Sequence, residues 1–399
     1  MLRCGASSGP GRQSVSSIQN RQVIVIRHPH LQKSPAPYDR FAVIGAGAWG
    51  TALATVIARR GRPVSLWARR KDLADAINAA GENAAYLPGV PLPHGISATS
   101  DLATALSGAE AVLMVTPSTS LREMSRAMRP HLKPGAAIAI CCKGIERGTG
   151  LLLSEVVAEE LPGHPMGAIS GPTFARETAL DHPTAATVAF PFNYGHRLEP
   201  GSAPAVRLAV SMSGGGFRPY VSDDLVGVEV GGAVKNVIAI ACGMMSGAGF
   251  AENTRAALIA RGIDEMKLLA EALGGRRETV TGLAGAGDLT LTCSSTTSRN
   301  MSLGLQLGQG IPRADCFDGQ PVVVEGEANA RSVIDLARRI GVVMPISQTV
   351  HAVLHEGADL AQTFSALWSR PIEAEPRALE LPFADAGPID PFNFKVQAV

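Results

Sequence analysis

The sequence lacks any excess of charge. Over 399 residues, 36 Lys and Arg balance 35 Asp and Glu, which gives no electrostatic reason to expect binding to nucleic acid or to an acidic membrane surface. The six cysteines form no C-x-x-C pattern, so neither a zinc ligand set nor a disulfide framework is indicated. We therefore expect a reducing, cytoplasmic setting.

Metal-binding patterns are also scarce. No H-E-x-x-H occurs. His351 and His355 have the i, i+4 spacing of a metal-binding pair on a helix, but no third ligand lies near them in sequence. We interpret them as part of a solvated helix face and expect no metal site.

Long uninterrupted apolar runs are absent too. A membrane-spanning helix needs about 18 apolar residues or more, and the strongest candidate, residues 237–251, is interrupted by Gly243, Gly247 and Gly249. We expect no membrane span and interpret this stretch as a buried helix. The chain is nevertheless 46% hydrophobic, enough for the cores of about two to three domains.

The two ends differ in composition from the rest. Residues 1–38 hold no acidic residue and are rich in Ser, Gln and Pro. This is typical of a disordered or mis-started leader, and also of an organelle transit peptide, so targeting by the leader is the alternative to a cytoplasmic location. Residues 371–399 are rich in proline, and we expect an irregular tail.

The middle of the chain has two textures. Between residues 39 and 222, short apolar runs alternate with helical stretches, as in the βα units of a parallel sheet. Residues 223–370 instead hold long Ala- and Gly-rich stretches with helical periodicity. We expect an α/β protein with a doubly wound N-terminal domain followed by a mainly α-helical C-terminal domain. The predicted strands are 41–44, 64–67, 111–115, 137–141 and 168–170.

A glycine-rich loop is the first functional signal. Gly45, Gly47 and Gly50 form G-x-G-x-x-G between a predicted strand and a predicted helix, as in Rossmann-type dinucleotide-binding domains. Further on, Arg69 and Arg70 stand where NAD-specific domains have an acidic residue. A guanidinium there can pair with a 2′-phosphate, although a solvated arginine pair is also possible. We expect NADP and NAD as cofactors, with a preference for NADPH.

Polar residues in the rest of the chain are candidates for chemistry. Lys143 follows a predicted strand, at the end where open α/β sheets bind ligands, which favours a role in the site over the alternative of an ordinary surface lysine. Lys235 lies in an apolar helical stretch, where burial and a second cation would lower its pKa enough for acid and base catalysis; a lysine reaching solvent is the alternative. Asp288 can orient a lysine, and Arg299 with Asn300 offers donors to a phosphate. Together they indicate a site for a small phosphorylated carbonyl compound.

These motifs resemble the bacterial-type NAD(P)-dependent glycerol-3-phosphate dehydrogenase family over residues 41–370. The resemblance rests on ordered segments, which are 45–53, 86–88, 170–177, 227–236, 253–262, 282–293, 298–300 and 324–326. It implies a homodimer and the reversible reduction of dihydroxyacetone phosphate to sn-glycerol 3-phosphate, which supplies glycerophospholipid synthesis.

The resemblance also implies roles for individual residues. Lys235 is implied as proton donor and acceptor, with Lys143 and Asp288 as further catalytic groups. The implied substrate contacts are Lys143, Gly171, Thr173, Lys235, Asn236, Asp288, Thr292, Ser298, Arg299 and Asn300. The implied cofactor contacts are Gly45, Gly47, Ala48, Trp49, Gly50, Arg69, Lys143, Ala175, Arg299, Val323 and Glu325.

Two other functions stay open at this point. A two-domain β-hydroxy acid dehydrogenase would share the same plan but recognise a carboxylate in place of a phosphate. A dinucleotide-sensing protein without catalysis would keep the glycine loop, but the presence of Lys143, Lys235 and Asp288 together weighs against it.

Overall fold

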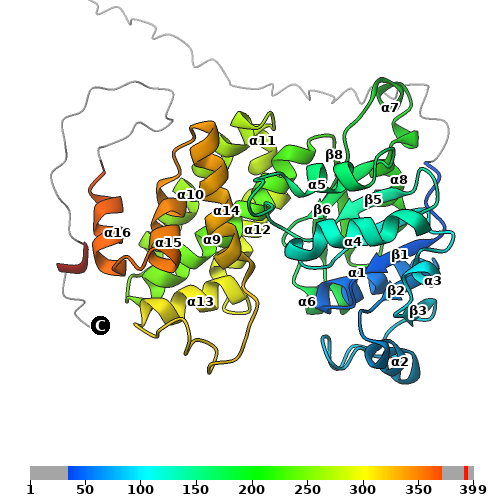
Figure 1. Cartoon of the computed structure of the whole chain (residues 1–399), viewed down its shortest axis with the longest axis horizontal. Coiled ribbons are helices and arrows are strands. Elements are labelled where there is room, and N and C mark those ends of the chain that lie inside the picture. The colour runs from blue at the N-terminus through cyan, green and yellow to red at the C-terminus, as the bar shows by residue number, and fades with distance from the viewer. Residues whose placement is uncertain (1–34, 371–390, 394–399) are drawn as a thin grey trace, which may run out of the picture. The chain divides into compact units, whose positions relative to one another are not determined.

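The strand order places the glycine-rich loop at the centre of the sheet. The computed structural model describes residues 35–370 and 391–393; its eight strands pair in the order β3-β2-β1-β4-β5-β6-β7-β8 (Figure 1). Pairing is parallel except between β6 and β7. The strand β1 lies between β2 and β4, which is the switch point where open α/β sheets bind ligands. The strands are β1 (Phe41–Ile44), β2 (Val64–Trp67), β3 (Ile96–Thr99), β4 (Ala111–Met114), β5 (Ala137–Ile140), β6 (Met166–Ser170), β7 (Thr184–Ala189) and β8 (Phe217–Ser222).

Helices cover both faces of this sheet. They are α1 (Ala48–Ala58), α2 (Lys71–Ala80), α3 (Leu102–Leu106), α4 (Leu121–Met128), α5 (Leu153–Glu160), α6 (Ala175–Ala179), α7 (Tyr194–Leu198) and α8 (Pro204–Met212), with 3₁₀ turns η1 (Ser118–Ser120), η2 (Arg129–His131) and η3 (Pro200–Ser202). Phe41 and Val43 pack with α1 and α8, whereas Ala42 and Ile44 pack with α3, α4 and α5. Burial of both faces explains why β1 is apolar throughout.

The five predicted strands are present, with boundaries that differ by two residues or fewer. The sequence reasoning missed β3, β7 and β8. Two of these are the edges of the sheet, and in β8, which contains Pro219, only Phe217 is buried. An edge strand is buried less than a central one, so its apolar signal is weaker.

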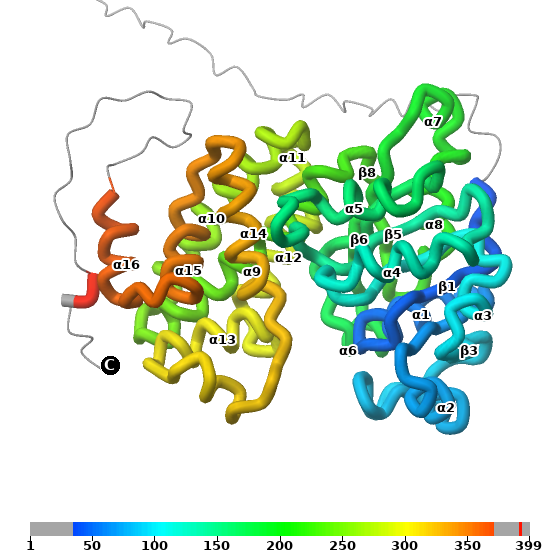
Figure 2. The backbone as a smooth tube through the Cα atoms, viewed as in Figure 1, coloured from blue at the N-terminus to red at the C-terminus, as the bar shows by residue number. Residues whose placement is uncertain are grey.

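The second half of the chain is helical and is built around one long helix, α9 (Leu225–Gly247) (Figure 2). Against it pack α10 (Glu252–Ala272), α11 (Arg277–Val280), the π-helical turn η4 (Leu283–Gly287), α12 (Asp288–Ser294), α13 (Arg299–Gly308), α14 (Glu325–Ile340) and α15 (Pro345–His355), and α16 (Leu360–Trp368) packs on the outer side of α15. The expected α/β domain followed by a mainly helical one is therefore confirmed.

Glycines in α9 are packing positions and do not break the helix. A Cβ at Gly243 would lie 2.8 Å from Cα of Gly304, and one at Gly247 would lie 3.0 Å from Cα of Gly308, so only glycine permits this approach of α9 and α13. By length and composition α9 is able to cross a membrane, yet 94% of its most apolar window is buried inside the protein. This is the position of a core helix.

The folded region begins before residue 39. Tyr38, which the sequence analysis placed in the leader, is buried; its N–H donates to Ser211 Oγ at 2.8 Å and its ring lies 4.0 Å from the Arg207 guanidinium carbon. The expectations for the rest of the leader and most of the tail lie outside the described residues, which exclude 1–34, 371–390 and 394–399. Residues 391–393 form a 3₁₀ turn, η5, whose Phe392 ring meets Phe250 edge-on.

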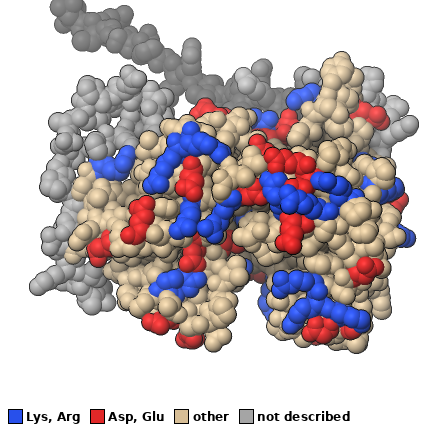
Figure 3. All heavy atoms as spheres, viewed as in Figure 1, with Lys and Arg blue, Asp and Glu red and all other residues tan. Residues whose placement is uncertain are grey.

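On one face, the surface agrees with the balanced composition. On the face drawn in Figure 3, basic and acidic side chains lie beside one another over much of the described surface. On this face, the fields of interspersed opposite charges partly cancel one another.

Candidate functional site

Two glycines of the loop are required by the protein's own packing. Gly45 has φ +122°, and a Cβ there would lie 2.9 Å from the carbonyl carbon of Val115 on the neighbouring β4 connection. A Cβ at Gly50 would lie 1.8 Å from the carbonyl oxygen of Gly45. The tight turn and the close approach of α1 to β1 therefore both need glycine, as the motif predicts.

Gly47 is different, because nothing in the protein requires it to be glycine. Its φ of −73° suits any residue, and a Cβ there would meet no atom within 4 Å. No side chain caps the N-terminus of α1, so backbone N–H groups stay available to an anion. An open backbone beside an uncapped helix N-terminus fits a dinucleotide pyrophosphate. Ala48, Trp49 and Ala175 pack against one buried apolar cluster, which contains Ala52 and Leu87.

Arg69 lies exposed just beyond the C-terminal end of β2. Its neighbour Arg70 forms an ion pair with Asp72 at 3.8 Å, but within the described ranges no acidic side chain engages Arg69. Its guanidinium is therefore free to pair with the 2′-phosphate of NADP. It can also hydrogen-bond the ribose hydroxyls of NAD, but this contact is less specific than a charged pair with a phosphate.

Three residues far apart in sequence meet in a buried polar cluster. Lys143 Nζ lies 2.5 Å from Asp288 Oδ2, and Lys235 Nζ lies 2.8 Å from Asp288 Oδ1. Lys235 also donates to Thr292 Oγ1 at 2.7 Å, and this hydroxyl donates to the Asp288 carbonyl at 2.6 Å. Both carboxylate oxygens are thus used, and the two ammonium groups are held on one anion.

Close packing against α9 creates this arrangement. A Cβ at Gly231 would lie 2.9 Å from the carbonyl oxygen of Ala284 in η4, and one at Gly232 would lie 3.2 Å from Cγ of Lys143. Gly231 therefore makes room for the π-helical turn that precedes Asp288, and Gly232 makes room for the side chain of Lys143. Both glycines lie about one helical turn before Lys235. Such π-helical turns recur at functional sites.

Burial and charge determine the protonation behaviour of the cluster. Burial lowers the pKa of the Lys235 ammonium; Asp288 opposes this, and Lys143 lowers the pKa further. Burial alone would raise the pKa of Asp288, but the two lysines outweigh it and hold the carboxyl below its usual range. The result is a permanent carboxylate next to a lysine that gives up its proton more readily than a solvated one.

A cavity of about 180 Å³ opens over this cluster. Among the predicted residues, it is lined by Lys143, Thr173, Lys235, Asn236, Asp288, Thr292, Ser298, Arg299, Asn300 and Glu325. The sequence reasoning missed Phe174, Leu291 and Thr297, which also line it. Leu291 lies three residues after Asp288 on one helix, a spacing that brings side chains to the same face.

Part of the cavity wall is a hydrogen-bonded chain of two asparagines and one glutamate. Asn236 Nδ2 donates to Glu325 Oε2 at 3.2 Å, and Asn300 Nδ2 donates to Asn236 Oδ1 at 2.9 Å. Asn300 Oδ1 in turn accepts from the N–H of Gly326 at 2.8 Å. Arg299 is exposed at the first position of α13, where a helix N-terminus adds to its positive field.

The structure does not bring every predicted residue to the cavity. Gly171 is buried against β7, where a Cβ would lie 2.9 Å from Cα of Ala186, so strand packing explains this glycine. Val323 is 63% exposed and does not line the cavity.

The expected solvated face around His351 is wrong. His351 is buried, its ring lies 5.3 Å from that of His355, and its Nδ1 faces Glu356 at 3.3 Å. Within the described part of the chain no group of three or more His, Cys, Asp or Glu is arranged to hold a metal ion.

Fold and site together define an oxidoreductase that uses a dinucleotide. The loop fitted to a pyrophosphate lies at the switch point of the sheet, and the two lysines come from the strand side and the helical side of the same cavity. Models of the NAD-dependent glycerol-3-phosphate dehydrogenase N-terminus and C-terminus match residues 40–193 and 224–365. The chain belongs to this family.

Individual relatives agree with this assignment. The chain is 48% identical over 337 residues to glycerol-3-phosphate dehydrogenase [NAD(P)+] of Rhodospirillum rubrum, covering 84% of this chain and 94% of the relative. It is 46% identical to the protein of the same name from Caulobacter vibrioides, covering 85% and 99%. The crystal structure of glycerol-3-phosphate dehydrogenase from Coxiella burnetii superposes with a TM-score of 0.76 at 41% identity, covering 83% of this chain and 99% of that one.

Proposed function

We propose that the protein catalyses the reversible NAD(P)H-dependent reduction of dihydroxyacetone phosphate to sn-glycerol 3-phosphate, which supplies glycerophospholipid synthesis. The observation that carries the proposal is the pair of lysines on one buried carboxylate, in a cavity that also holds a free arginine. The family and its NAD(P)-dependent relatives support the same reaction.

Three residues of the cavity have different roles in the reaction. Lys235 donates a proton to the substrate oxygen during reduction and accepts it during oxidation, since its lowered pKa suits both directions. Lys143 stabilises the negative charge that develops on that oxygen. Asp288 holds both ammonium groups in place.

Binding of the remote phosphate orients the carbonyl group. Arg299 and the first N–H groups of α13 bind the phosphate. The binding energy gained there fixes the carbonyl next to Lys235. Thr173, Asn236, Thr292, Ser298 and Asn300 complete the wall around the substrate.

The cofactor is held by the glycine-rich loop. A bound NAD(P)H supplies the hydride that the ketone carbon accepts. Gly47 and the N-terminus of α1 bind the pyrophosphate, and Arg69 favours a 2′-phosphate over a hydroxyl. We therefore infer use of both NADPH and NADH, with NADPH preferred.

A substrate panel tests the proposal directly. Oxidation of NADPH, followed by absorbance, should depend on dihydroxyacetone phosphate and fail with β-keto acids of similar size. Reduction of the keto acids alone would favour the β-hydroxy acid dehydrogenase. Tight NADPH binding with no oxidation by any compound of the panel would favour a sensing protein.

We also propose a division of the chain at residues 222 and 223 into a nucleotide-binding part, 39–222, and a substrate part, 223–370. The end of the sheet at Ser222, the start of α9 at Leu225 and the separate family models support it. Limited proteolysis within residues 39–370 should therefore yield stable fragments that end only at the boundary near residues 222 and 223.

We infer a homodimer in the cytoplasm. The family resemblance supports the dimer; the Gly/Ala-rich helix α9 does not, because it is buried inside its own protomer. The five described cysteines are unpaired, which supports a reducing compartment. Light scattering on the purified full chain measures the oligomeric state, and cell fractionation measures the location.

A further inference from the structure

Lys143 begins a segment, residues 143–152, that is anchored in the helical half of the protein. Ile145 and Leu152 pair across an isolated bridge, and both side chains are buried in the helical core. Arg339 of α14 donates to the carbonyl oxygen of Gly150 at 3.1 Å. The segment thus leaves the sheet after β5, contacts the helical half and returns to α5.

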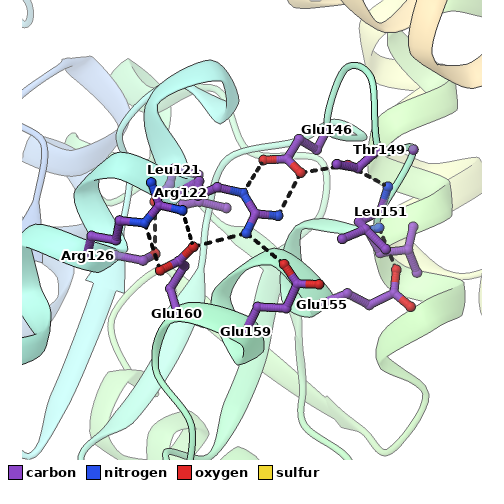
Figure 4. Close-up of polar contacts among 12 residues, drawn as sticks. Leu121, Arg122, Arg126, Glu146, Thr149, Leu151, Glu155, Glu159 and Glu160 are labelled. Atoms are coloured by element: carbon purple, nitrogen blue, oxygen red, sulfur yellow. Dashed lines mark hydrogen bonds and ion pairs between the residues drawn. The ribbon is translucent and has the colours of Figure 1, made fainter.

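On its other side, the segment is held by a single arginine, Arg122, near the start of α4. Its Nε and Nη2 donate to the two carboxylate oxygens of Glu146, both at 2.8 Å. Its Nη1 donates to Glu159 at 2.6 Å and to Glu160 at 3.0 Å. Figure 4 shows the guanidinium between Glu146 on one side and Glu159 and Glu160 on the other. A bidentate pair of this kind fixes geometry as well as charge.

The residues around Lys143 leave little room for the segment to shift. Gly144 has φ +156°, and a Cβ there would lie 2.9 Å from Asn329 Oδ1 and 3.1 Å from Ser118 Oγ. Lys143 itself packs on Gly232 and reaches Asp288 across the cavity wall. A displacement of the segment by about 1 Å would therefore move Lys143 Nζ away from its present position, 2.5 Å from the carboxylate of Asp288.

We propose that Arg122 is a positioning residue for Lys143 and acts through Glu146. Arg122 does not line the cavity, so its effect on the reaction has to pass through the segment. This inference rests on the proposed function, because Lys143 has its catalytic role only there. Arg126, one turn along the same helix, binds Glu160 and not Glu146, which makes it the matched control.

A kinetic double-mutant cycle tests the proposal. Arg122→Gln should lower kcat/KM for dihydroxyacetone phosphate about tenfold, because Arg122 and Lys143 are coupled through the segment. Arg126→Gln should leave it within about twofold. In a Lys143→Ala background, Arg122→Gln should cause no further loss. A full additional loss in that background, or an equal loss from Arg126→Gln, would overturn the proposal.

The Glu146→Gln variant and a measurement of hydrogen–deuterium exchange keep the proposal testable if Arg122→Gln does not fold. Glu146→Gln keeps the shape of the side chain and should reproduce the kinetic pattern if Arg122→Gln fails to fold, as judged by thermal unfolding. Hydrogen–deuterium exchange of the full chain should be faster in residues 143–152 for Arg122→Gln or Glu146→Gln, and unchanged for Arg126→Gln. Unchanged exchange in all three refutes the positioning role whatever the activity. A wild-type chain inactive on dihydroxyacetone phosphate refutes the proposed function instead, and the exchange result still decides the role of Arg122.

Discussion

At the scale of single residues, the chemistry depends on the surroundings of Lys235. The ammonium group of a lysine in water has a pKa of about 10.4, so it rarely releases its proton at neutral pH. Burial and Lys143 lower the pKa of Lys235, while Asp288 and Thr292 keep its ammonium group oriented. Thr292 thus only orients Lys235, whereas Asp288 both orients it and opposes the lowering of its pKa.

Removal of the Lys235 amine should abolish turnover and spare the cofactor site. In Lys235→Ala, kcat should fall about 10²–10⁴-fold, the usual contribution of a general acid. NADPH affinity, measured by fluorescence, should stay near the wild-type value because the glycine loop is untouched. Lys133→Ala, which removes a surface lysine bound to Glu110, is the control. A parallel loss of turnover and NADPH binding in Lys235→Ala would indicate a structural lysine.

Arg299 should act mainly on substrate affinity. Its guanidinium lines the cavity and is exposed, so Arg299→Ala removes a charge-assisted phosphate contact. KM for dihydroxyacetone phosphate should rise about 10–100-fold. Arg313→Ala breaks an ion pair with Glu327 away from the cavity, and it should leave KM unchanged. An unaltered KM in Arg299→Ala contradicts its assignment to the phosphate.

At the scale of elements, one buried amide holds the glycine-rich loop. Asn83 is fully buried, and its Nδ2 donates to the Ala46 carbonyl at 2.9 Å and to Thr51 Oγ1 at 2.7 Å. It joins the 81–91 connection to the loop and to the first turn of α1. The position of the pyrophosphate-binding backbone therefore depends on a residue outside the motif.

Loss of Asn83 should weaken cofactor binding specifically. Asn83→Ala leaves the Ala46 carbonyl without its partner, which costs about 1–3 kcal/mol, and NADPH affinity should fall by about tenfold. Asn78→Ala is matched, because Asn78 makes two backbone hydrogen bonds to Ala98 on β3 and is separate from the loop. It should lower the unfolding temperature and leave NADPH affinity unchanged. Equal affinities in the two variants would show that Asn83 is only structural.

How much the sequence predicts also differs by element. The glycine loop and the neighbouring strands β1, β2, β4, β5 and β6 are local patterns, and both were found, whereas the interior strand β7 was missed. The edge strands β3 and β8 were missed because they lack the continuous apolar pattern of buried strands. Asp288 was predicted next to a lysine, but its contact with both lysines depends on the close packing at Gly231 and Gly232. Arg122 gave no sequence signal, because its partners lie 24 to 38 residues away along the chain.

At the scale of the whole molecule, a buried carboxylate connects the sheet half to the helical half. Glu229 of α9 accepts hydrogen bonds from Ser154 N at 2.8 Å and Ser154 Oγ at 2.5 Å at the start of α5. Burial raises the pKa of Glu229 to about 7, although the hydrogen bonds from Ser154 oppose this. The contact between the halves is therefore sensitive to pH near neutrality.

The sign of this pH dependence follows from the raised pKa. The folded state keeps a proton on Glu229 that the unfolded state releases near pH 4.3, so stability from this group is lost as pH rises through about 7. Between pH 5.5 and 8.5, the unfolding temperature of wild type should fall by a few degrees relative to Glu229→Gln. Glu110→Gln is the control, because the pKa of Glu110 is lowered. A constant difference between wild type and Glu229→Gln would show that Glu229 stays ionised.

A crystal structure with NADPH and dihydroxyacetone phosphate is the most direct test of the site. The Thr292→Val variant suits this experiment, because it retains both lysines and we expect the loss of one hydrogen-bond partner of Lys235 to slow turnover. We predict the substrate oxygen within hydrogen-bonding distance of Lys235 Nζ and the phosphate at Arg299 and the N-terminus of α13. A substrate bound with its phosphate toward Lys235, or away from Asp288 and both lysines, would contradict the account.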